Sequence, residues 1–577
     1  MKNMFSIFPL KSLSLCIFGL VISITSQASA AKHIDTTASK TPTQPNIILI
    51  LTDDQPYGYL GITGNKIVKT PNIDELANQG VLFTNAHVSS AICTPSRISI
   101  LLGQYERKHG VNFNSGTSVS EEAWESSYPM LLRKAGYFTG WVGKNHSPVG
   151  KGGYKSGLME KSFDYWYAGH GHLSFYPKDR HKIFSEAKTD TQLEVVSEGI
   201  DDFLDTNEYK FKKAIKFLDS RPTDQPFMLS VNLNLPHGSS TSTMKMKETD
   251  DEIYKSLFRD QTLPLPKNYI AKADIKTPKL PTDIHHVIDR QNGYNVVDTP
   301  EKFREEYTRQ LQAMTGIDRL VGKLKRKLKD QKIDDNTVII FTSDHGLFMG
   351  EQGLGGKALC YEKTTHVPLI IYDPRNKQNN KTSNALVQSI DIAPTLLSLA
   401  NVKQASTFQG ENLMPLYNAT DVTAQTKRKY IFSENLWSTH FGNPRCESIQ
   451  TNEWKYIRYY KNNNLSATKK IALAKQLKIP VNKMLYAFHD NDIAQYREFI
   501  EGPLHNEPVV YEELYNLNND PTELKNVVTD KEYQQQLNTM RKDWYQTLLS
   551  ARGTEAPKVE RFTIDSQQEH NTDIKQY

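Results

Sequence analysis

Side chains that can bind ions or transfer protons follow four apolar segments of the chain. Residues 47–51 are followed by two aspartates, and residues 338–341 are followed by an aspartate and a histidine. The side chains placed in this way are Asp53, Asp54, Lys144, His146, His237, Asp344 and His345. Carboxylates bind hard cations, lysines bind oxyanions and histidines carry protons. Each position alone is weak evidence, because paired aspartates are often turn residues or helix caps and a lone histidine is more often a loop residue.

The most specific motif is Cys-Thr-Pro-Ser-Arg at residues 93–97. Pro95 suits the first turn of a helix, and residues 98–102 continue that helix until Gly103. Cys93 is therefore predicted beside a helix N-terminus, with Arg97 one turn further on. Both features stabilise an anionic nucleophile or an oxyanion. Without this setting, a cysteine before a helix is more often a small buried apolar residue.

The apolar segments and the helical patterns between them predict an α/β domain from residue 43 to about residue 400. The expected strands are residues 47–51, 138–142, 227–235, 338–341 and 369–372. Helical spacing of apolar residues indicates a helix over residues 311–328, and another begins near Ile392. In an open α/β sheet, ligands bind outside the carboxyl ends of the strands. We therefore expect the polar side chains that follow the strands to converge in one crevice.

The pattern changes beyond residue 420. Residues 430–432, 454–459 and 513–517 predict short antiparallel strands, and residues 532–549 predict a helix. The polar stretch at residues 237–298 is predicted as an insertion of loops. We expect three parts, namely a signal peptide at residues 1–30, a catalytic domain at 31–422 and a smaller C-terminal α+β subdomain at 423–577.

The first thirty residues have the pattern of a secretory signal. Lys2 and Lys11 precede an apolar run at residues 13–24, and small residues at 28–30 suit cleavage. The run is too short to span a bilayer, and no later segment is long and apolar enough, so no membrane anchor is expected. The alternative is an uncleaved anchor. The prediction is an exported protein, periplasmic or secreted.

The net charge argues against a nucleic-acid-binding protein, and the number of cysteines argues against a disulfide-rich one. The formal charge of +5 becomes +3 without the two lysines of residues 1–30, which is compatible with a polyanionic substrate but not with a nucleic-acid partner. Cys93, Cys360 and Cys446 follow residue 30, and an odd number argues against a disulfide framework. Cys360 is expected to be structural. For His170 and His172, neither a substrate contact nor a surface loop is favoured.

The motif at residues 93–97 resembles the signature of formylglycine-dependent (type I) sulfatases, in which the cysteine is oxidised to formylglycine. Further motifs of that family are matched at residues 46–54, 70–74, 136–139, 143–146, 342–346 and 513–521. The resemblance covers nearly the whole chain after residue 30. It implies an alkaline-phosphatase-like fold, with a large mainly parallel sheet flanked by helices and a small C-terminal antiparallel sheet. Leu102, Asn145 and His345 depart from the family pattern without removing a catalytic group.

The resemblance also implies a metal site. Asp53, Asp54, Asp344 and His345 would hold one divalent cation, and the modified Cys93 would complete the site. Three carboxylates suit Ca²⁺, which the family usually holds. Imidazole is a poor ligand for Ca²⁺, so Mg²⁺ and Mn²⁺ stay open.

The remaining roles come from the family mechanism. The hydrated aldehyde attacks sulfur, the cation and Arg97 favour its ionised hydroxyl, and Lys144 and Lys357 neutralise the sulfate oxygens. His237 protonates the leaving alcohol, and His146 later removes a proton so that sulfate leaves and the aldehyde reforms. Lys357 is assigned from the glycines before it and from Tyr-Glu at 361–362; the alternative is an exposed lysine in a glycine-rich loop.

The implied activity is hydrolysis of sulfate esters of an extracellular sulfated saccharide, such as an algal polysaccharide or a glycosaminoglycan, by a bacterial polysaccharide sulfatase. A formylglycine-generating enzyme would be a partner. One alternative is a phosphate or phosphonate monoester hydrolase on the same scaffold. The other is a non-catalytic carbohydrate-binding protein, if Cys93 is unmodified.

Overall fold

A computed structural model of the chain describes residues 44–113, 117–169, 214–237, 256–281, 297–376, 381–419, 426–436, 444–461, 475 and 500–561. These residues belong to one compact unit, residues 44–577, which excludes residues 1–43. The expected signal peptide therefore lies outside the described residues, as do His170 and His172. Among the helices that are described, none has both the length and the apolar character that a membrane crossing needs.

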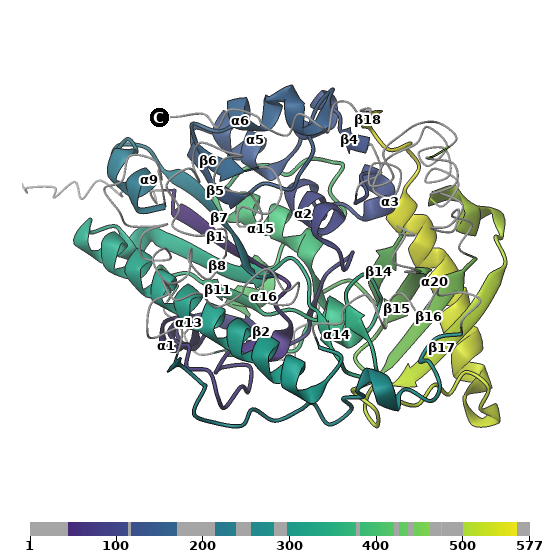
Figure 1. Cartoon of the computed structure of the whole chain (residues 1–577). Helices are drawn as coiled ribbons and strands as arrows, with labels where there is room; N and C mark the ends of the chain where they lie inside the picture. The colour runs from purple at the N-terminus through teal and green to yellow at the C-terminus, as the bar shows by residue number, and fades with distance from the viewer. Residues whose placement is uncertain are drawn as a thin grey trace, which may run out of the picture. The chain divides into compact units, whose positions relative to one another are not determined.

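An eight-stranded sheet in the order β12-β2-β11-β8-β1-β7-β5-β6 occupies the centre of this unit (Figure 1). Its strands are β1 (Asn46–Asp53), β2 (Val81–Phe83), β5 (Phe138–Lys144), β6 (Tyr165–Gly169), β7 (Phe227–Pro236), β8 (Thr337–Ser343), β11 (Leu369–Tyr372) and β12 (Lys381–Ser383). β1 pairs in parallel with β7 and β8, and β5 with β6 and β7, whereas β11 is antiparallel to both of its neighbours. The mainly parallel sheet confirms the predicted fold class.

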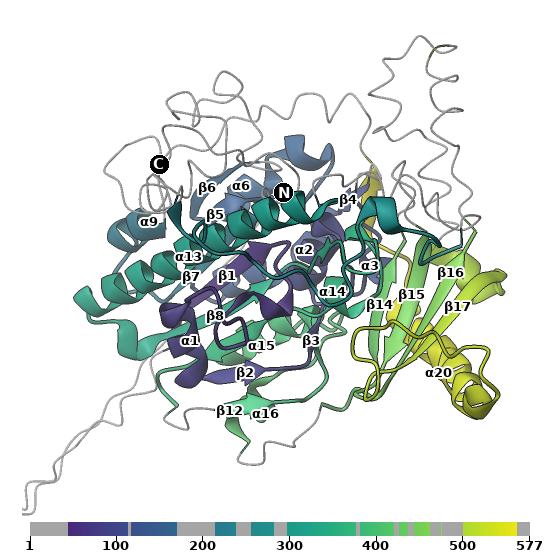
Figure 2. The same ribbon diagram turned by 60° about the horizontal axis from the view of Figure 1, so that its bottom comes forward.

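Helices flank the sheet in two groups (Figures 1 and 2). One group contains α1 (Pro71–Asn78), α9 (Ala214–Ser220) and α13 (Pro300–Asp330), and the other contains α2 (Cys93–Leu102), α5 (Tyr128–Lys134) and α15 (Ile392–Leu399). The central strands β1 and β8 contain continuous apolar runs because they are buried on both faces. Residues 47–51 of β1, for example, are all at most 2% exposed.

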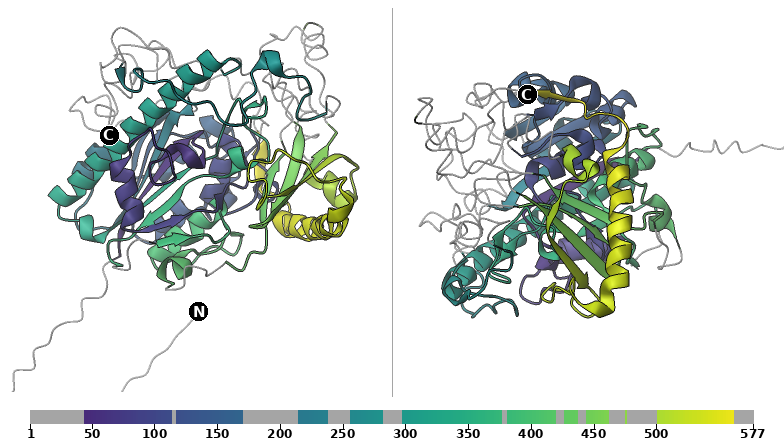
Figure 3. Two further views of the ribbon diagram at one scale, coloured as in Figure 1. Left: turned by 90° about the horizontal axis from the view of Figure 1, so that it is seen from below. Right: turned by 90° about the vertical axis from the view of Figure 1, so that its right-hand side faces the viewer.

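A second, antiparallel sheet follows in the order β14-β15-β16-β17. Its strands are β14 (Ile431–Asn435), β15 (Arg445–Gln450), β16 (Trp454–Tyr460) and β17 (Val509–Asn516). Helix α20 (Gln534–Arg552) lies along this sheet and packs Trp544 and Leu548 against Phe432 and Tyr456 (Figure 3). The predicted small C-terminal sheet is therefore confirmed, although β15 was not expected. The predicted boundary near residue 422 lies outside the described residues.

Candidate active site

The strand ends that the sequence singled out lie at one edge of the large sheet. β8, β1, β7 and β5 are consecutive in the sheet and parallel, so their carboxyl ends share that edge. β1 ends at Asp53, β5 ends at Lys144, and β7 and β8 are followed by His237 and Asp344. All four side chains are buried. The expected convergence of these side chains is therefore what the structure shows.

Cys93 is the first residue of α2, and its thiol lies inside this group. Its Sγ is 3.6 Å from Asp53 Oδ1, 3.3 Å from His345 Nε2 and 3.1 Å from Lys357 Nζ. Helix α2 is fixed to the end of β8, because Arg97 Nε donates to Asp344 Oδ2 at 2.9 Å. The N-terminal end of a helix favours negative charge, so an anion formed at residue 93 is stabilised by the helix as well as by its neighbours.

Each of the three aspartates is paired with a basic side chain. Lys144 donates to Asp53, and Lys357 Nζ donates to Asp54 Oδ1 at 2.8 Å. Asp54 has a positive φ of 60°, an uncommon conformation for a residue other than glycine, directly after β1. Its backbone N–H donates to Asp344 Oδ1 at 3.2 Å. This turn brings the second aspartate of the pair back towards the end of β8.

The electric field of the cluster separates the pKa values of its members. Burial alone raises the pKa of Asp53, but Lys144, His237 and Arg97 hold it well below its usual value. Burial keeps the pKa of Asp54 raised in spite of Lys357. For His345, burial lowers the pKa, but the nearby Asp344 and other anionic groups outweigh it and raise the pKa to about 9. The neighbouring cations therefore favour the ionised form of Asp53, and the neighbouring anions favour the charged form of His345.

The donor set fits a divalent cation. Two overlapping groups, Asp53–Asp54–Cys93–His237 and Asp53–Cys93–Asp344–His345, have ligand atoms within 4.8 Å of one another, and all of these side chains are buried. Asp54 Oδ2 accepts no hydrogen bond from the described residues, although His237 Nε2 lies 3.6 Å away. A buried carboxylate oxygen without a hydrogen bond is costly, and a bound cation would satisfy it.

The cluster also contains donors suited to an anion. Arg97 is 1% exposed, and among the described residues its Nη1 and Nη2 atoms find no hydrogen-bond acceptor. Nη2 lies 3.8 Å from Asp53 Oδ2, which is an ion-pair distance but too long for a hydrogen bond. A guanidinium with two uncommitted nitrogens presents the planar donor pair that binds an oxyanion in a bidentate manner.

The two predicted proton carriers occupy different positions. His237, after β7, faces Asp54. His146 is buried two residues beyond β5, with a φ of 45°, and its ring meets Phe113 edge-on at 5.3 Å. The two histidines therefore come from different strands of the sheet.

Sequence reasoning missed several polar residues that support the cluster. Ser343 Oγ accepts a hydrogen bond from the backbone N–H of Gln55 at 3.1 Å and donates to the carbonyl of His345 at 3.0 Å. Ser96 Oγ donates to the carbonyl of Asp344 at 2.5 Å. These serines tie the ends of β1, β8 and α2 together. Their only sequence signal is that each is adjacent to a predicted site residue.

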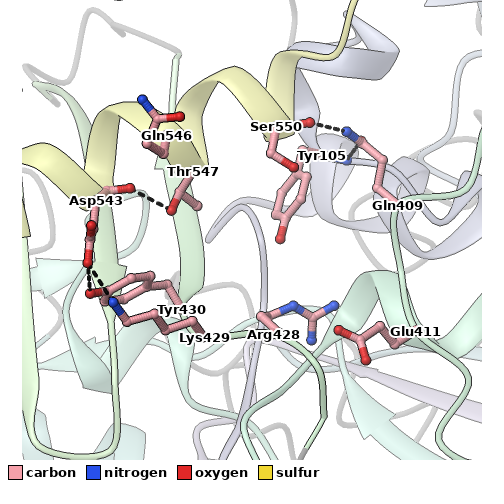
Figure 4. Close-up of a pocket in the computed structure, with 10 residues that line it drawn as sticks. All are labelled: Tyr105, Gln409, Glu411, Arg428, Lys429, Tyr430, Asp543, Gln546, Thr547 and Ser550. Atoms are coloured by element: carbon pink, nitrogen blue, oxygen red, sulfur yellow. Dashed lines mark hydrogen bonds and ion pairs between the residues drawn. The ribbon is translucent and has the colours of Figure 1, made fainter.

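A second pocket, of about 470 Å³, lies near the other end of α2 (Figure 4). It includes Tyr105, three residues after α2 ends, and side chains of α20. Its cations are already paired, Lys429 with Asp543 at 2.8 Å and Arg428 with the buried Asp391 at 2.6 Å. Among the described residues that line it, none belongs to the predicted site, so it is no candidate for the reaction.

The fold and the buried cluster together define an α/β protein with a buried polar site at the carboxyl edge of its large sheet. Solved structures with the same fold include a protein in complex with its substrate D-glucosamine-2-N,6-O-disulfate (TM-score 0.62, 20% identity, covering 89% of this chain and 99% of that one). The fold is also similar to a phosphonate monoester hydrolase of Silicibacter pomeroyi (TM-score 0.64, 19% identity, covering 89% and 96%). At these identities the likeness shows the fold alone.

The sulfatase family model matches residues 45–402. The chain therefore belongs to the sulfatase family and is a sulfuric ester hydrolase. A model described as N-sulphoglucosamine sulphohydrolase, C-terminal, matches residues 350–471. Relatives include an N-acetylglucosamine-6-O-sulfatase of Bacteroides thetaiotaomicron (26% identical, covering 72% of this chain and 79% of the relative). Another is an ulvan-active sulfatase of Formosa agariphila (27% identical, covering 82% and 87%).

Proposed function

We propose that this protein hydrolyses sulfate esters of a sulfated carbohydrate, with formylglycine made from Cys93 and with one divalent cation. The observation that carries the proposal is the buried Arg97. Its two uncommitted guanidinium nitrogens lie beside Asp53, in the cluster that also contains the thiol of Cys93. A buried cation with free donors is costly unless an anionic group occupies the space next to it. A sulfate ester supplies such a group.

We assign the cation to Asp53, Asp54, Asp344 and His345, together with the oxygen of modified residue 93. A bound cation supplies Lewis-acid stabilisation of the negative charge that develops in the reaction. Three carboxylates favour Ca²⁺, while His345 also suits Mn²⁺, and Mg²⁺ is a third candidate. A cation held by Asp53 and Asp54 would take over part of the charge pairing that Lys144 and Lys357 now supply, so that both lysines could contact sulfate.

Formylglycine supplies a hydrated aldehyde with two hydroxyls, one to attack sulfur and one to release the sulfate afterwards. Arg97 and the N-terminus of α2 stabilise negative charge at that position. Lys144 and Lys357 come from two different segments beside residue 93. Lys144 ends β5, and Lys357 follows β10 (Gly355–Gly356). This arrangement can neutralise sulfate oxygens while water is kept out, because both lysines are buried.

We assign the leaving-group proton to His237 and the later proton removal at residue 93 to His146. His237 faces Asp54, with its Nε2 3.6 Å from Asp54 Oδ2, so the ring lies at the edge of the proposed cation site. Departure of an unactivated sugar alcohol near neutral pH needs such an acid. The different strands that carry the two histidines allow one on each side of the reacting sulfur.

The named relatives support a carbohydrate substrate. One acts on N-acetylglucosamine 6-sulfate groups by its name, and another is active on ulvan, an algal polysaccharide. We therefore propose a sulfated glycan as the substrate class, with a maturation enzyme that modifies Cys93. We also propose that residues 1–30 direct export, that the catalytic domain covers residues 31–422 and that the smaller subdomain covers residues 423–577.

Two measurements on the purified protein test the proposal. Mass spectrometry of the peptide that contains residue 93 should show a lower mass than the unmodified cysteine peptide, because the thiol has been replaced by an aldehyde. Desulfation assays over a panel of sulfated oligosaccharides should then identify at least one substrate. Phosphate and phosphonate monoesters are the competing substrates. A modified protein that hydrolyses only these would reject the sulfatase activity, and a fully unmodified Cys93 would leave only carbohydrate binding.

A further inference from the structure

Two of the four cysteines lie side by side outside the group of residues that form the candidate active site. Cys360 Sγ and Cys446 Sγ are 3.4 Å apart, although 86 residues separate them in the chain. Both side chains are at most 1% exposed. Cys360 follows Lys357 by three residues, and Cys446 is in β15 of the antiparallel sheet. The contact therefore joins the loop of a proposed catalytic lysine to the C-terminal sheet.

The surroundings exclude a metal site at this contact. The two cysteines share an apolar cluster with Leu359, Ile457 and Tyr459. Among the described residues, the groups able to hold a metal include neither cysteine. The second contact of Cys360 is the carbonyl of Ser433 at 3.5 Å. Two adjacent thiols without a metal can be oxidised to a disulfide.

We propose that Cys360 and Cys446 form a disulfide that links the Lys357 loop to β15. The thiols give up two protons and two electrons to a disulfide oxidant, such as oxidised glutathione, which becomes two molecules of thiol. A disulfide has an S–S length of about 2.05 Å, so the sulfurs approach by about 1.4 Å, which small side-chain rotations supply. The other two cysteines lie elsewhere, Cys16 within residues 1–30 and Cys93 in the active-site cluster.

The disulfide would add to hydrogen bonds that already join the residues next to Cys360 to the antiparallel sheet. Tyr361 donates to Glu513 of β17 at 2.9 Å, and Lys455 of β16 donates to Glu362 at 3.1 Å. Tyr361 and Glu362 are the residues next to Cys360 in the chain. A covalent bond at Cys360 would therefore stabilise the backbone from Lys357 to α14 (Glu362–Thr365). It would also restrict the unfolded chain over a long loop, which stabilises the folded state.

Burial determines when the bond can form. Burial, together with the neighbouring Cys360, raises the pKa of Cys446 well above its usual value. Exchange requires a thiolate, so oxidation in the folded protein is slow and the oxidant must be present while the chain folds. The same burial then protects the bond from reductants.

The test is synthesis of the full chain in a cell-free system buffered with oxidised and reduced glutathione. The protein is denatured without reductant in the presence of N-ethylmaleimide, digested and analysed by mass spectrometry. We expect a linked peptide that contains residues 360 and 446 and that separates on reduction. Cys446→Ser is the matched control, in which Cys360 should carry the maleimide. Separate maleimide-labelled peptides of both cysteines from the folded wild-type protein would overturn the proposal.

Thermal unfolding provides an independent measurement. The oxidised protein should melt about 2–4 °C higher than protein made in reductant, because the bond restricts the unfolded chain. The double variant Cys360→Ser/Cys446→Ser should melt at one temperature in both preparations. Equal melting temperatures of the two wild-type preparations would reject a stabilising disulfide. Neither experiment depends on sulfatase activity or on the state of Cys93, so a failure here is distinct from a failure of the proposed function.

Discussion

At the scale of single residues, the site combines three buried carboxylates with three buried basic side chains. Lys144, Arg97 and Lys357 each pair with a different aspartate. Burial of such charges is costly unless they are paired. Pairing alone does not explain why Nη1 and Nη2 of Arg97 find no hydrogen-bond acceptor among the residues that the structure describes. Charges retained at this cost are typical of functional sites, where they meet a substrate or an ion.

Replacement of Cys93 tests the nucleophile. Cys93→Ala should lower sulfatase turnover at least about 1,000-fold, because the reacting group is lost, and should leave the melting temperature nearly unchanged, because the side chain is small. The two measurements are the rate of release of desulfated product and the melting temperature. Cys360→Ala is the matched control, since it removes a buried thiol outside the cluster. It is compared with wild type in protein made in reductant, so that the proposed bond to Cys446 is absent from both. Substantial activity in a verified Cys93→Ala protein would contradict the assignment.

Replacement of Asp344 tests the cation site. Asp344→Asn keeps the shape of the side chain but removes one negative charge, so metal affinity and turnover should fall together. Exhaustive treatment of the wild type with a chelator should have the same effect, and added Ca²⁺, Mg²⁺ or Mn²⁺ should restore activity to different extents. Isothermal titration with each ion measures the affinity directly. Unchanged turnover after complete metal removal would show that the reaction needs no cation.

At the scale of elements, the position of each functional side chain follows from a strand end or a helix start. The carboxyl ends of the parallel strands β8, β1, β7 and β5 lie at one edge of the large sheet. Helix α2 begins at this edge with Cys93. The backbone N–H of Ala358 donates to the carbonyl of Ala91 at 2.9 Å, which holds the Lys357 loop against the segment that leads into α2. Regular backbone geometry thus orients the site, as precise catalytic geometry requires.

The two strand-end histidines should fail in different ways when replaced. His237→Ala should reduce turnover of sugar sulfates roughly 100-fold to 10,000-fold but affect an activated aryl sulfate much less, since a good leaving group needs little protonation. His146→Ala should act on the later step, so that the first turnover survives and sulfate stays attached at residue 93. The measurements are kcat for both substrate types, the first-turnover burst and the intact mass of the protein.

His505→Ala is the control for these histidines, because His505 is exposed and lies in the C-terminal part of the chain. It should leave both substrate types unaffected. Equal losses for sugar and aryl sulfates in His237→Ala, together with no added mass in His146→Ala, would contradict this division of roles. The family membership does not depend on that result.

At the scale of the whole molecule, buried ionic contacts join helix α3 (Glu106–His109), soon after α2 in the chain, to the antiparallel sheet. Arg107 of α3 donates from Nε to Glu434 of β14 at 2.6 Å and also donates to Glu447 of β15. All three side chains are buried. Loss of one partner from such a network leaves an unpaired buried charge, so the two sheets should unfold together rather than separately.

Acid should destabilise the protein through His109 of the same helix. Its Nε2 lies 3.1 Å from Ser99 Oγ, its Nδ1 accepts from the backbone N–H of Val111, and burial lowers its pKa to about 3. The unfolded chain binds a proton near pH 6.5, whereas the folded chain does not until about pH 3. Stability is therefore present above pH 6.5 and is lost as the pH falls, by about 1.4 kcal/mol per pH unit.

Denaturant unfolding of wild type and His109→Gln at pH 7.5 and pH 5.5 measures this contribution. The variant should lose less stability than the wild type between the two pH values, since it carries no proton-binding group at that position. His505→Gln, at an exposed site, should follow the wild type. An identical pH dependence in His109→Gln and wild type would show that His109 does not contribute to acid instability.

Local patterns were enough to predict the strands that carry the site. β1 and β8 contain continuous apolar runs that are followed by polar residues, because strands buried on both faces favour apolar side chains. β5 and β7 are mainly apolar and are also followed by polar residues. The predicted α13 was correct in type but begins earlier, at Pro300, because its first turns carry few apolar residues. Periodicity detects a helix only where one face is apolar.

β15 could not be predicted in this way. It places the charged residues Arg445 and Glu447 in buried positions, where they pair with Glu507 and Arg107. Such a strand has no apolar pattern, and its stability depends on partners that are distant in the chain. The two supporting serines of the site, Ser96 and Ser343, were missed for a related reason, since a serine is equally common in turns and on surfaces.

The meeting of Lys357 with Cys93, and of Cys360 with Cys446, is a property of the tertiary structure. The first pair is 264 residues apart in the chain and the second 86. Motifs along the chain indicate which residue types are present and which strand or helix carries them. Distances between such residues depend on strand order and on the packing of two sheets, because side chains from remote segments become neighbours only when the apolar surfaces that carry them are buried together.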